Sequence, residues 1–262
     1  MACSPASWPP WDPTFPSIPG PSGYRGATGT GRGGWCCRRA GWTTPTTPPR
    51  RLQRPRPWSP VAESTPGEAR LVLASGSPRR LELLRAAGFD PEVRVPPVDE
   101  TPLPGEEPAA MVERLALAKL RAVVVAGETG LAADTVVVVD GEVLGKPGTP
   151  ERAGEMLRRL SGRTHQVVGG IAMRRDRYDA SGVVRTGVTM RAMTDEEIAA
   201  YVATGEPLDK AGGYAIQGGG GDFVTGVDGC RDNVVGLSIG AVLEMLTMLG
   251  GQPPSRAGGS SR

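Results

Sequence analysis

The feature that most constrains the fold is an apolar run at residues 71–74, followed after residues 75–77 by a helix that begins with proline. Ser77 is a favourable residue type for the N-cap position, and Pro78 suits the first helical position because its missing N–H needs no partner there. Gly88 is the residue type that usually ends a helix. The segment therefore predicts a strand, a tight turn and a helix over residues 71–88.

The start of this helix has the chemistry of an anion-binding site. Free backbone N–H groups, the Ser75 and Ser77 hydroxyls, and two arginines gather at an end that carries about half a positive charge from the macrodipole. Arg79 and Arg80 oppose that dipole, so they are poor choices for stabilising the helix. The pattern favours phosphate contact by both arginines over the alternative of two solvated side chains.

Strands and helices alternate along the rest of the chain, which predicts an α/β fold with a mixed sheet. Apolar runs and turn residues predict further strands at 92–95, 131–139, 142–145, 166–173, 183–191 and 223–227. Amphipathic spacing and capping residues predict further helices at 111–126, 150–160, 194–203 and 236–249, with a glycine-rich stretch at 212–221.

Composition divides the chain into three parts. Residues 1–68 hold 14 of the 26 prolines and all five tryptophans, without strand or helix periodicity, which predicts disorder. We interpret this part as a passive extension or as sequence upstream of the true start, with nucleic-acid binding as the alternative. Residues 69–252 are predicted to form one domain, and residues 253–262 a disordered tail.

The charge balance argues against a nucleic-acid partner for the domain. Eight arginines against three acids in residues 1–68 leave a net charge of −3 for the remainder, although the whole chain carries +2. No apolar run approaches the roughly 20 residues of a membrane span. The four cysteines form no CxxC pair, and no signal-peptide core follows Met1, so we expect a cytoplasmic protein.

Two charged residues lie where apolar side chains are expected. Lys119 lies about 40° around its helix from Leu115, within the apolar stripe, so it either reaches the surface or points into a cleft. Asp134 opens a strand of four valines, where an unpaired carboxylate would be costly. Asp134 is therefore a candidate for ligand chemistry, with a structural role as the alternative, and Thr135 should face the opposite side of the strand.

Other candidates have weaker individual signals. Asp99 and Glu100 form either a solvated acidic loop or, with Asp134, a site for Mg²⁺. Lys146 follows a strand in a rigid turn, and Gln217 offers the donor and acceptor that recognition of a base edge requires. His165 is the only histidine, and its position favours a structural role.

Taken together, these segments resemble the Maf family of nucleoside triphosphate pyrophosphatases. The matching motifs are LASGSPRRLELL (73–84), PVDET (97–101), RLALAKLRA (114–122), AADTVV (132–137), GKP (145–147), LSGRTHQV (160–167), GEPLDKAGGYAIQG (205–218) and NVVGLS (233–238). They occur in the family's order and cover almost all of residues 69–249, and the N-terminal extension has no counterpart in the resemblance.

The resemblance implies a two-lobed α/β fold with a central cleft, related to inosine-triphosphate pyrophosphatases. It implies hydrolysis of a nucleoside triphosphate to the monophosphate and pyrophosphate with a divalent metal, Mg²⁺ or Mn²⁺, and it is compatible with a homodimer. Asp134 takes the position of the proposed general base. Arg79, Thr135 and Gln217 take positions associated with choice of base, and they match the branch that prefers dTTP and UTP rather than 7-methyl-GTP.

On this interpretation the substrate contacts are made by Ser75, Arg79, Arg80, Lys119, Thr135, Lys146 and Gln217, and the metal is held by Asp99, Glu100 and Asp134. Ser238 and residues 230–232 depart from the family pattern, which affects fine specificity more than the reaction. Two alternatives are a nucleotide-binding regulator of cell division without turnover, and an enzyme that removes modified or purine nucleotides.

Overall fold

The computed structural model describes residues 41–43 and 71–254. The prediction of disorder for residues 1–68 and 253–262 falls largely outside these ranges. Within the extension, Gly41–Thr43 forms the short strand β1, which pairs antiparallel with residues 181–183. Backbone pairing with an available strand edge can hold such a short segment without any periodic apolar pattern of its own.

The described residues form one eight-stranded mixed sheet in the order β1-β7-β6-β4-β2-β3, with β5 paired to β4 and β8 paired to β7. The strands after β1 are β2 (Val72–Ala74), β3 (Glu92–Val93), β4 (Thr129–Val139), β5 (Glu142–Leu144), β6 (Thr164–Arg175), β7 (Tyr178–Met190) and β8 (Val224–Asp228). β2 runs parallel to β3 and β4, whereas β4, β6 and β7 are antiparallel neighbours. The α/β class with a mixed sheet is confirmed.

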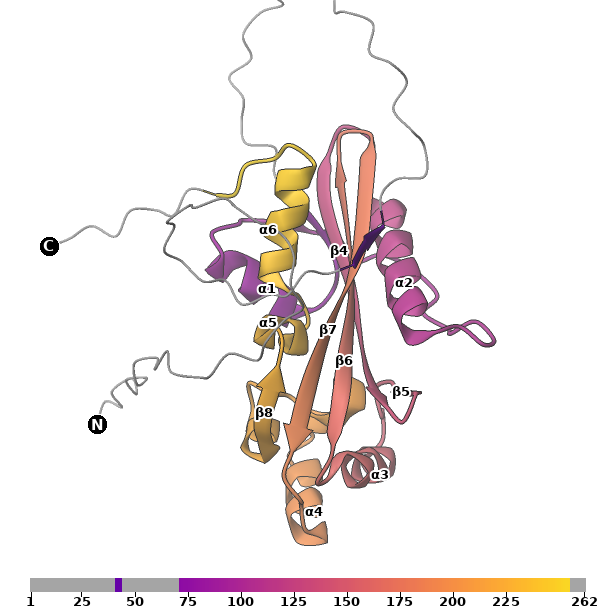
Figure 1. Cartoon of the computed structure of the whole chain (residues 1–262), viewed down its shortest axis with the longest axis vertical. Coiled ribbons are helices and arrows are strands. Elements are labelled where there is room, and N and C mark those ends of the chain that lie inside the picture. Colours follow the sequence, from indigo (N-terminus) through magenta and orange to yellow (C-terminus); the bar gives the residue numbers. More distant parts are fainter. Residues whose placement is uncertain (1–40, 44–70, 255–262) are drawn as a thin grey trace, which may run out of the picture. The chain divides into compact units, whose positions relative to one another are not determined.

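Helices cover both faces of this sheet (Figure 1). They are α1 (Pro78–Ala86), α2 (Pro108–Val123), α3 (Pro150–Leu160), α4 (Asp195–Ala203), α5 (Arg231–Val235) and α6 (Ile239–Met248), with 3-10 turns η1 (Glu206–Asp209), η2 (Ala211–Gly213) and η3 (Gly219–Phe223). α2 lies on one face, and α1 and α6 lie on the other. α3, α4 and β8 surround the far ends of the long strands and form the second lobe.

Side chains along β4 point alternately to the two faces of the sheet, so each residue packs either against α2 or against the α1 and α6 side. Ala132 packs with the α2 residues Ala116 and Leu120, whereas Leu131 and Ala133 pack with the α1 and α6 side. Successive side chains of a strand point to opposite faces. Asp134 therefore continues the α2 side, and Thr135 continues the α1 and α6 side, as the sequence predicts.

The start of α1 differs in one detail from the prediction. Ser77 is the N-cap residue and Pro78 follows it, but the Ser77 side chain makes no capping hydrogen bond. Instead the Ser77 N–H donates to Ser75 Oγ over 3.2 Å. Gly88 has a φ of 90° after the helix end, which confirms its predicted role.

The hairpin of β6 and β7 is longer than the predicted strands at 166–173 and 183–191. Charged residues near its tip lie outside the predicted strands, but they continue the ladder as cross-strand partners. Arg174 lies opposite Asp179 in the register, and its Nε lies 2.7 Å from Asp179 Oδ1. The turn itself uses Asp176, at a φ of 57°. Within the ranges that the structure describes, no helix is long and apolar enough to cross a membrane.

Candidate active site

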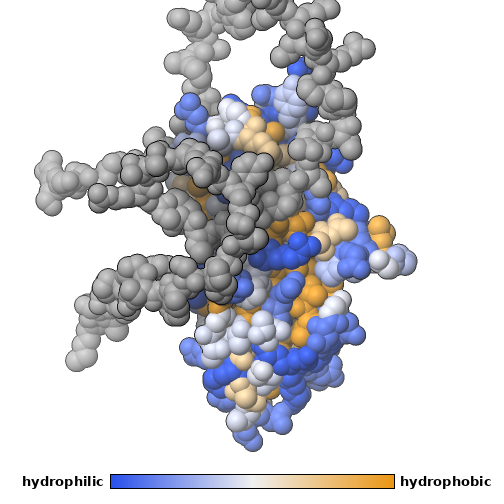
Figure 2. Space-filling model, in the orientation of Figure 1, coloured by the Kyte–Doolittle hydropathy of each residue, from blue (hydrophilic) through white to orange (hydrophobic). Residues whose placement is uncertain are grey.

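A pocket of about 700 Å³ lies between the two lobes. Its walls come from the β2–α1 turn, α2, β4, the loop after β5, and the segments 209–217 and 234–236. Figure 2 shows hydrophobic surface in this part of the molecule, between α2 and the region of β5 and α3, beside strongly hydrophilic residues. Of the predicted substrate contacts, all line the pocket: Ser75, Arg79, Arg80, Lys119, Thr135, Lys146 and Gln217.

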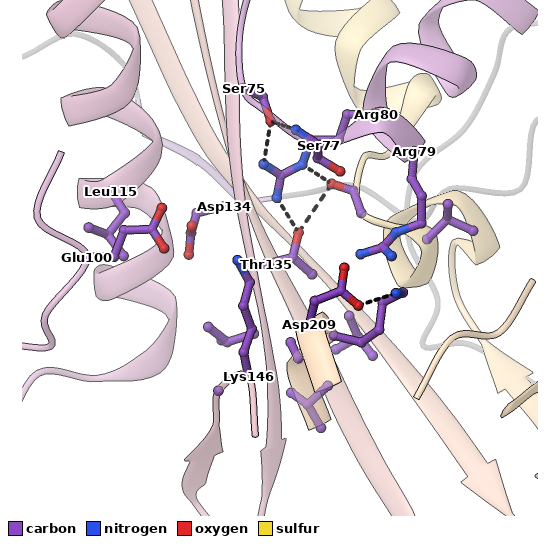
Figure 3. A pocket seen from close by; sticks show the side chains of 18 of the residues that line it. Ser75, Ser77, Arg79, Arg80, Glu100, Leu115, Asp134, Thr135, Lys146 and Asp209 are labelled. Atoms are coloured by element: carbon purple, nitrogen blue, oxygen red, sulfur yellow. Dashed lines mark hydrogen bonds and ion pairs between the residues drawn. The ribbon is translucent and has the colours of Figure 1, made fainter. Parts of the chain in front are cut away.

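Lys119 and Asp134 form a buried ion pair on one side of the pocket. Their Nζ and Oδ1 atoms are 2.6 Å apart, and the two residues are 6% and 7% exposed. Glu100, from the loop before α2, places its Oε1 2.5 Å from the same Lys119 nitrogen. Lys119 thus points into the cleft, and its ammonium lies between two carboxylates that come from distant parts of the sequence (Figure 3 shows the two acids side by side).

The electrostatics keep Glu100 ionised. Partial burial raises its pKa, but the hydrogen bond and charge of Lys119, with Lys146 and Arg80 nearby, outweigh burial and leave the pKa below its usual value. Within residues 71–254, hydrogen bonds and ion pairs occupy one oxygen each of Glu100 and Asp134. Each carboxylate therefore has one oxygen left for a ligand, and both face a cationic cleft. Carboxylate oxygens of this kind are the donors that Mg²⁺ uses beside substrate phosphates.

Asp99 is the one predicted metal ligand that the structure does not bring to the pocket. Its Oδ1 accepts hydrogen bonds from Thr101 N and Thr101 Oγ1, at 2.9 and 2.6 Å, and these bonds lower its pKa. Asp99 is absent from the pocket wall, whereas its neighbour Glu100 is part of it. In the described part of the chain, no three Asp, Glu, His or Cys residues cluster in a way that would hold a metal by themselves.

Arg80 is bound to the protein on the opposite side of β4. Its Nε donates to Gly236 O over 2.9 Å, and its Nη1 donates to Ser75 Oγ and Ala133 O over 3.1 and 2.8 Å. Its Nη2 donates to Thr135 Oγ1 over 3.2 Å. Burial lowers the pKa of this guanidinium, and the charges of Asp134 and Glu100 oppose that effect. Arginine side chains are not deprotonated in proteins, so Arg80 acts only as a hydrogen-bond donor.

The other cationic side chains border the open part of the cleft. Figure 3 shows Lys146 extending toward Asp134 and Thr135, and Arg79 lying near Asp209. Arg79 is half-buried, and Lys146 and Gln217 are exposed. No hydrogen bond from the Arg79 side chain to another residue of 71–254 is present, so its guanidinium is available to a ligand.

The pocket also contains residues that sequence reasoning did not select. Asp209 and Lys210 form an ion pair on the wall, and Lys210 Nζ donates to Glu206 O over 3.2 Å. Tyr214 is buried in the wall, and its hydroxyl lies 2.8 Å from His165 Nε2. The sequence pattern selects only Gln217 from their segment, although a lysine beside an aspartate in a glycine-rich segment is an available signal.

His165 lies outside the pocket wall, which agrees with its predicted structural role. It is 2% exposed, its ring meets Tyr214 edge-on at 5.4 Å, and its Nδ1 has no hydrogen-bond partner in the described region. Burial lowers its pKa to about 4. Because Nδ1 has no acceptor there, a charged imidazolium would be poorly stabilised at this position.

We expect this histidine to make stability depend on pH. The folded state binds fewer protons than the unfolded state between about pH 6.5 and 4, so the contribution is present above that window and is lost as the pH falls through it. The loss is about 3 kcal/mol in the free energy of unfolding. Urea denaturation of the wild type and of His165→Gln at pH 7 and pH 4 measures it. A decrease of equal size in both proteins would contradict the assignment.

Cys230 and Ser238, which depart from the family pattern, are in contact with each other. Cys230 Sγ lies 3.3 Å from Ser238 Oγ, and both residues are buried. Ser238 is also the N-cap of α6, because its Oγ accepts a hydrogen bond from Ala241 N. Neither residue lines the pocket, so the two residues can support the wall but do not form its surface.

Comparisons with known proteins agree with this geometry. A family model described as "Maf-like protein" matches residues 70–249. A dTTP/UTP pyrophosphatase of Anaeromyxobacter sp. (strain Fw109-5) is 51% identical over 195 residues, which cover 72% of this chain and 94% of that protein. Proteins with the same description from Symbiobacterium thermophilum and Moorella thermoacetica are 50% and 51% identical, over 69% and 70% of this chain and 94% and 96% of their own lengths.

Proposed function

The chain belongs to the Maf family, and from this premise we propose that it hydrolyses nucleoside triphosphates, dTTP and UTP foremost, to the monophosphate and pyrophosphate. The observation that carries the proposal is the buried Lys119–Asp134 pair with Glu100, facing a cleft that also contains Arg79 and Lys146. Phosphoryl transfer depends on positioning and charge neutralisation, which these groups can supply.

The cationic residues suit the triphosphate. Arg79 at the start of α1 adds a guanidinium to the partial positive charge of a helix N-terminus, where phosphate oxygens are well stabilised. Lys146 extends into the cleft from the other lobe (Figure 3), and the Ser75 hydroxyl lies in the β2–α1 turn. We assign these three groups, with Lys119, to the phosphate chain.

The acidic residues suit a divalent cation and the attacking water. Glu100 and Asp134 would hold Mg²⁺ or Mn²⁺ together with phosphate oxygens, and the ion would polarise the α-phosphate and lower the pKa of the attacking water. Asp134 accepts a hydrogen bond from this water and takes its proton as the oxygen bonds to the α-phosphorus. The bond from the α-phosphorus to the bridging oxygen then breaks, and pyrophosphate leaves as one unit.

The choice of base is assigned to Thr135, which faces the side of β4 opposite Asp134, and to Gln217 and Arg79 on the pocket wall. Thr135 and Gln217 line the pocket with Arg79, and these positions match the branch of the family that prefers dTTP and UTP. The exposed amide of Gln217 can both donate and accept a hydrogen bond, as a base edge requires. The relatives described above are dTTP/UTP pyrophosphatases, which supports the same nucleotides.

A nucleotide panel tests the proposal on the full chain with Mg²⁺ or Mn²⁺. We expect pyrophosphate from dTTP and UTP and none from 7-methyl-GTP, with pyrophosphate and orthophosphate measured separately. Pyrophosphate from other bases, including modified or purine nucleotides, would keep the reaction and reject the base assignment. Orthophosphate alone would reject the pyrophosphatase proposal.

The regulator without turnover is not favoured. Such a protein needs to bind a nucleotide but has no use for a buried carboxylate paired with lysine at the end of a cationic cleft. Tight binding of dTTP with no product of any kind would reverse this preference.

A further inference from the structure

We propose that Arg80 is a positioning residue and not a phosphate ligand. Its guanidinium binds Ala133 O and Thr135 Oγ1, on either side of Asp134 in the sequence, and holds Gly236 O beside Thr135. That carbonyl takes the Thr135 hydroxyl hydrogen, so the hydroxyl can only accept a hydrogen bond from a ligand. The cleft should therefore favour a base that presents an N–H donor at this point over one that presents an acceptor. This inference rests on the proposed function for the identity of the ligand.

The first step is that the Arg80 guanidinium already donates nearly all of its hydrogen bonds within the protein. Arginine has five N–H donors, and four of those in Arg80 are used within the protein, on Gly236 O, Ser75 Oγ, Ala133 O and Thr135 Oγ1. A phosphate that took a bidentate grip on Arg80 would have to break at least one of these bonds. Arg79, the preceding residue, makes no such side-chain hydrogen bonds within residues 71–254 and lies on the pocket wall.

The second step is that two of the groups that accept hydrogen bonds from Arg80 belong to the neighbours of Asp134 on β4. Ala133 and Thr135 flank Asp134 in the sequence, and both are bound by the same guanidinium. Asp134 itself faces the other side of β4, where Lys119 Nζ lies 2.6 Å from its Oδ1. The strand is thus held from both faces at the residue assigned to the chemistry. The bond to Ser75 connects the guanidinium to the β2–α1 turn (Figure 3), and the bond to Gly236 connects it to the segment before α6.

The third step concerns the Thr135 hydroxyl. Thr135 Oγ1 lies 3.2 Å from Gly236 O, which is a carbonyl oxygen and can only accept, so the hydroxyl hydrogen is used there. Arg80 Nη2 can only donate, so it uses one lone pair of the same oxygen. One lone pair remains for a ligand. The imide N3–H of thymine or uracil can donate to it, whereas the N3 of cytosine is itself an acceptor and would be repelled.

The test compares Arg80→Lys with the matched control Arg79→Lys in the full chain. We expect Arg80→Lys to leave the inhibition constant of inorganic tripolyphosphate within about twofold of wild type and to lower the dTTP-to-dCTP ratio of kcat/KM about tenfold. Arg79→Lys should instead weaken tripolyphosphate inhibition about tenfold. Weaker inhibition in Arg80→Lys with an unchanged base ratio would overturn the inference, because that is the behaviour of a phosphate ligand.

The same bond can be tested from its other end if Arg80→Lys fails to fold. Thr135→Val removes the acceptor and should lower the dTTP-to-dCTP ratio, whereas Thr135→Ser keeps the hydroxyl and should retain it. The double variant Arg80→Lys with Thr135→Val should lose no more selectivity than either single variant, because both act through one hydroxyl. Additive losses, or a ratio that Thr135→Val leaves unchanged, would contradict the inference.

A failure of the proposed function has a different signature. A wild-type chain that releases no pyrophosphate from any nucleotide rejects the function and leaves no kcat/KM ratio to measure. The inference about Arg80 is then measured by the binding of dTMP and dCMP. A wild-type preference for dTMP that Arg80→Lys reduces supports it, and equal binding of the two by wild type rejects it.

Discussion

Replacement of Asp134 with asparagine is expected to lower the rate of pyrophosphate release by about 100-fold or more while the protein still folds. Asparagine has the same shape and can still accept a hydrogen bond from Lys119 Nζ through its side-chain oxygen. It cannot take a proton from water, and it is a poor ligand for a hard cation. Lys119 keeps Glu100 as an ionic partner in the variant, so no buried charge is left alone.

The measurement is kcat with dTTP together with the dissociation constant for the same nucleotide. We expect a large loss in kcat and a much smaller change in affinity, because the triphosphate is assigned to Arg79, Lys146 and the β2–α1 turn. Asp140→Asn is the matched control, since Asp140 makes an exposed ion pair with Arg163 in a hairpin turn and lies outside the pocket wall. Near-wild-type turnover by Asp134→Asn would remove Asp134 from the mechanism.

Local chemistry made much of the fold predictable from the sequence. Pro78, Gly88 and the capping box at Thr194 mark helix ends through backbone hydrogen bonding within a few residues, and the structure contains all three. The turn at Asp140 and Gly141 is set by two positive φ values, which are favourable for these residue types. Such signals depend on neighbours in sequence, so they survive without knowledge of the tertiary structure.

The candidate site was predictable where a residue type conflicts with its local pattern. Lys119 within an apolar stripe and Asp134 before four valines both indicated an unusual partner, and the structure shows that they are partners of each other. The saturation of Arg80 was not predictable, because its acceptors include a carbonyl group 156 residues away in the sequence. Asp99 and Glu100 were equivalent in sequence, and only the path of their loop separates them.

The approach of α2 to the sheet is a second feature that the sequence does not reveal. Gly170 on β6 lies directly opposite Asp134 on β4. A Cβ atom at Gly170 would lie 2.2 Å from Val112 O and 2.7 Å from Glu113 N, which are backbone atoms of α2. Val112 precedes Lys119 by two helical turns, so both residues lie on the same side of the helix. The missing side chain of Gly170 is therefore what lets α2 bring Lys119 to Asp134.

Substitution of this glycine by alanine should consequently damage both stability and activity. We expect Gly170→Ala to lower the free energy of unfolding by about 3 kcal/mol, because the overlap is with helix backbone and no flexible side chain can move aside. The folded fraction should turn over dTTP at least about tenfold more slowly, since α2 must move outward and carry Lys119 away from Asp134. Urea denaturation and kcat under conditions where the variant is folded measure the two effects.

Gly187→Ala on β7 controls for the general effect of replacing a strand glycine with alanine. It is also a strand glycine in the same sheet, but the nearest atom to its added Cβ is Asp228 Cβ, at an ordinary contact distance of 3.6 Å. Its stability should change by less than about 1 kcal/mol, with kcat unaffected. If Gly170→Ala behaved like this control, α2 would have to adjust without strain. The distance between helix and sheet would then not be what sets the Lys119–Asp134 contact.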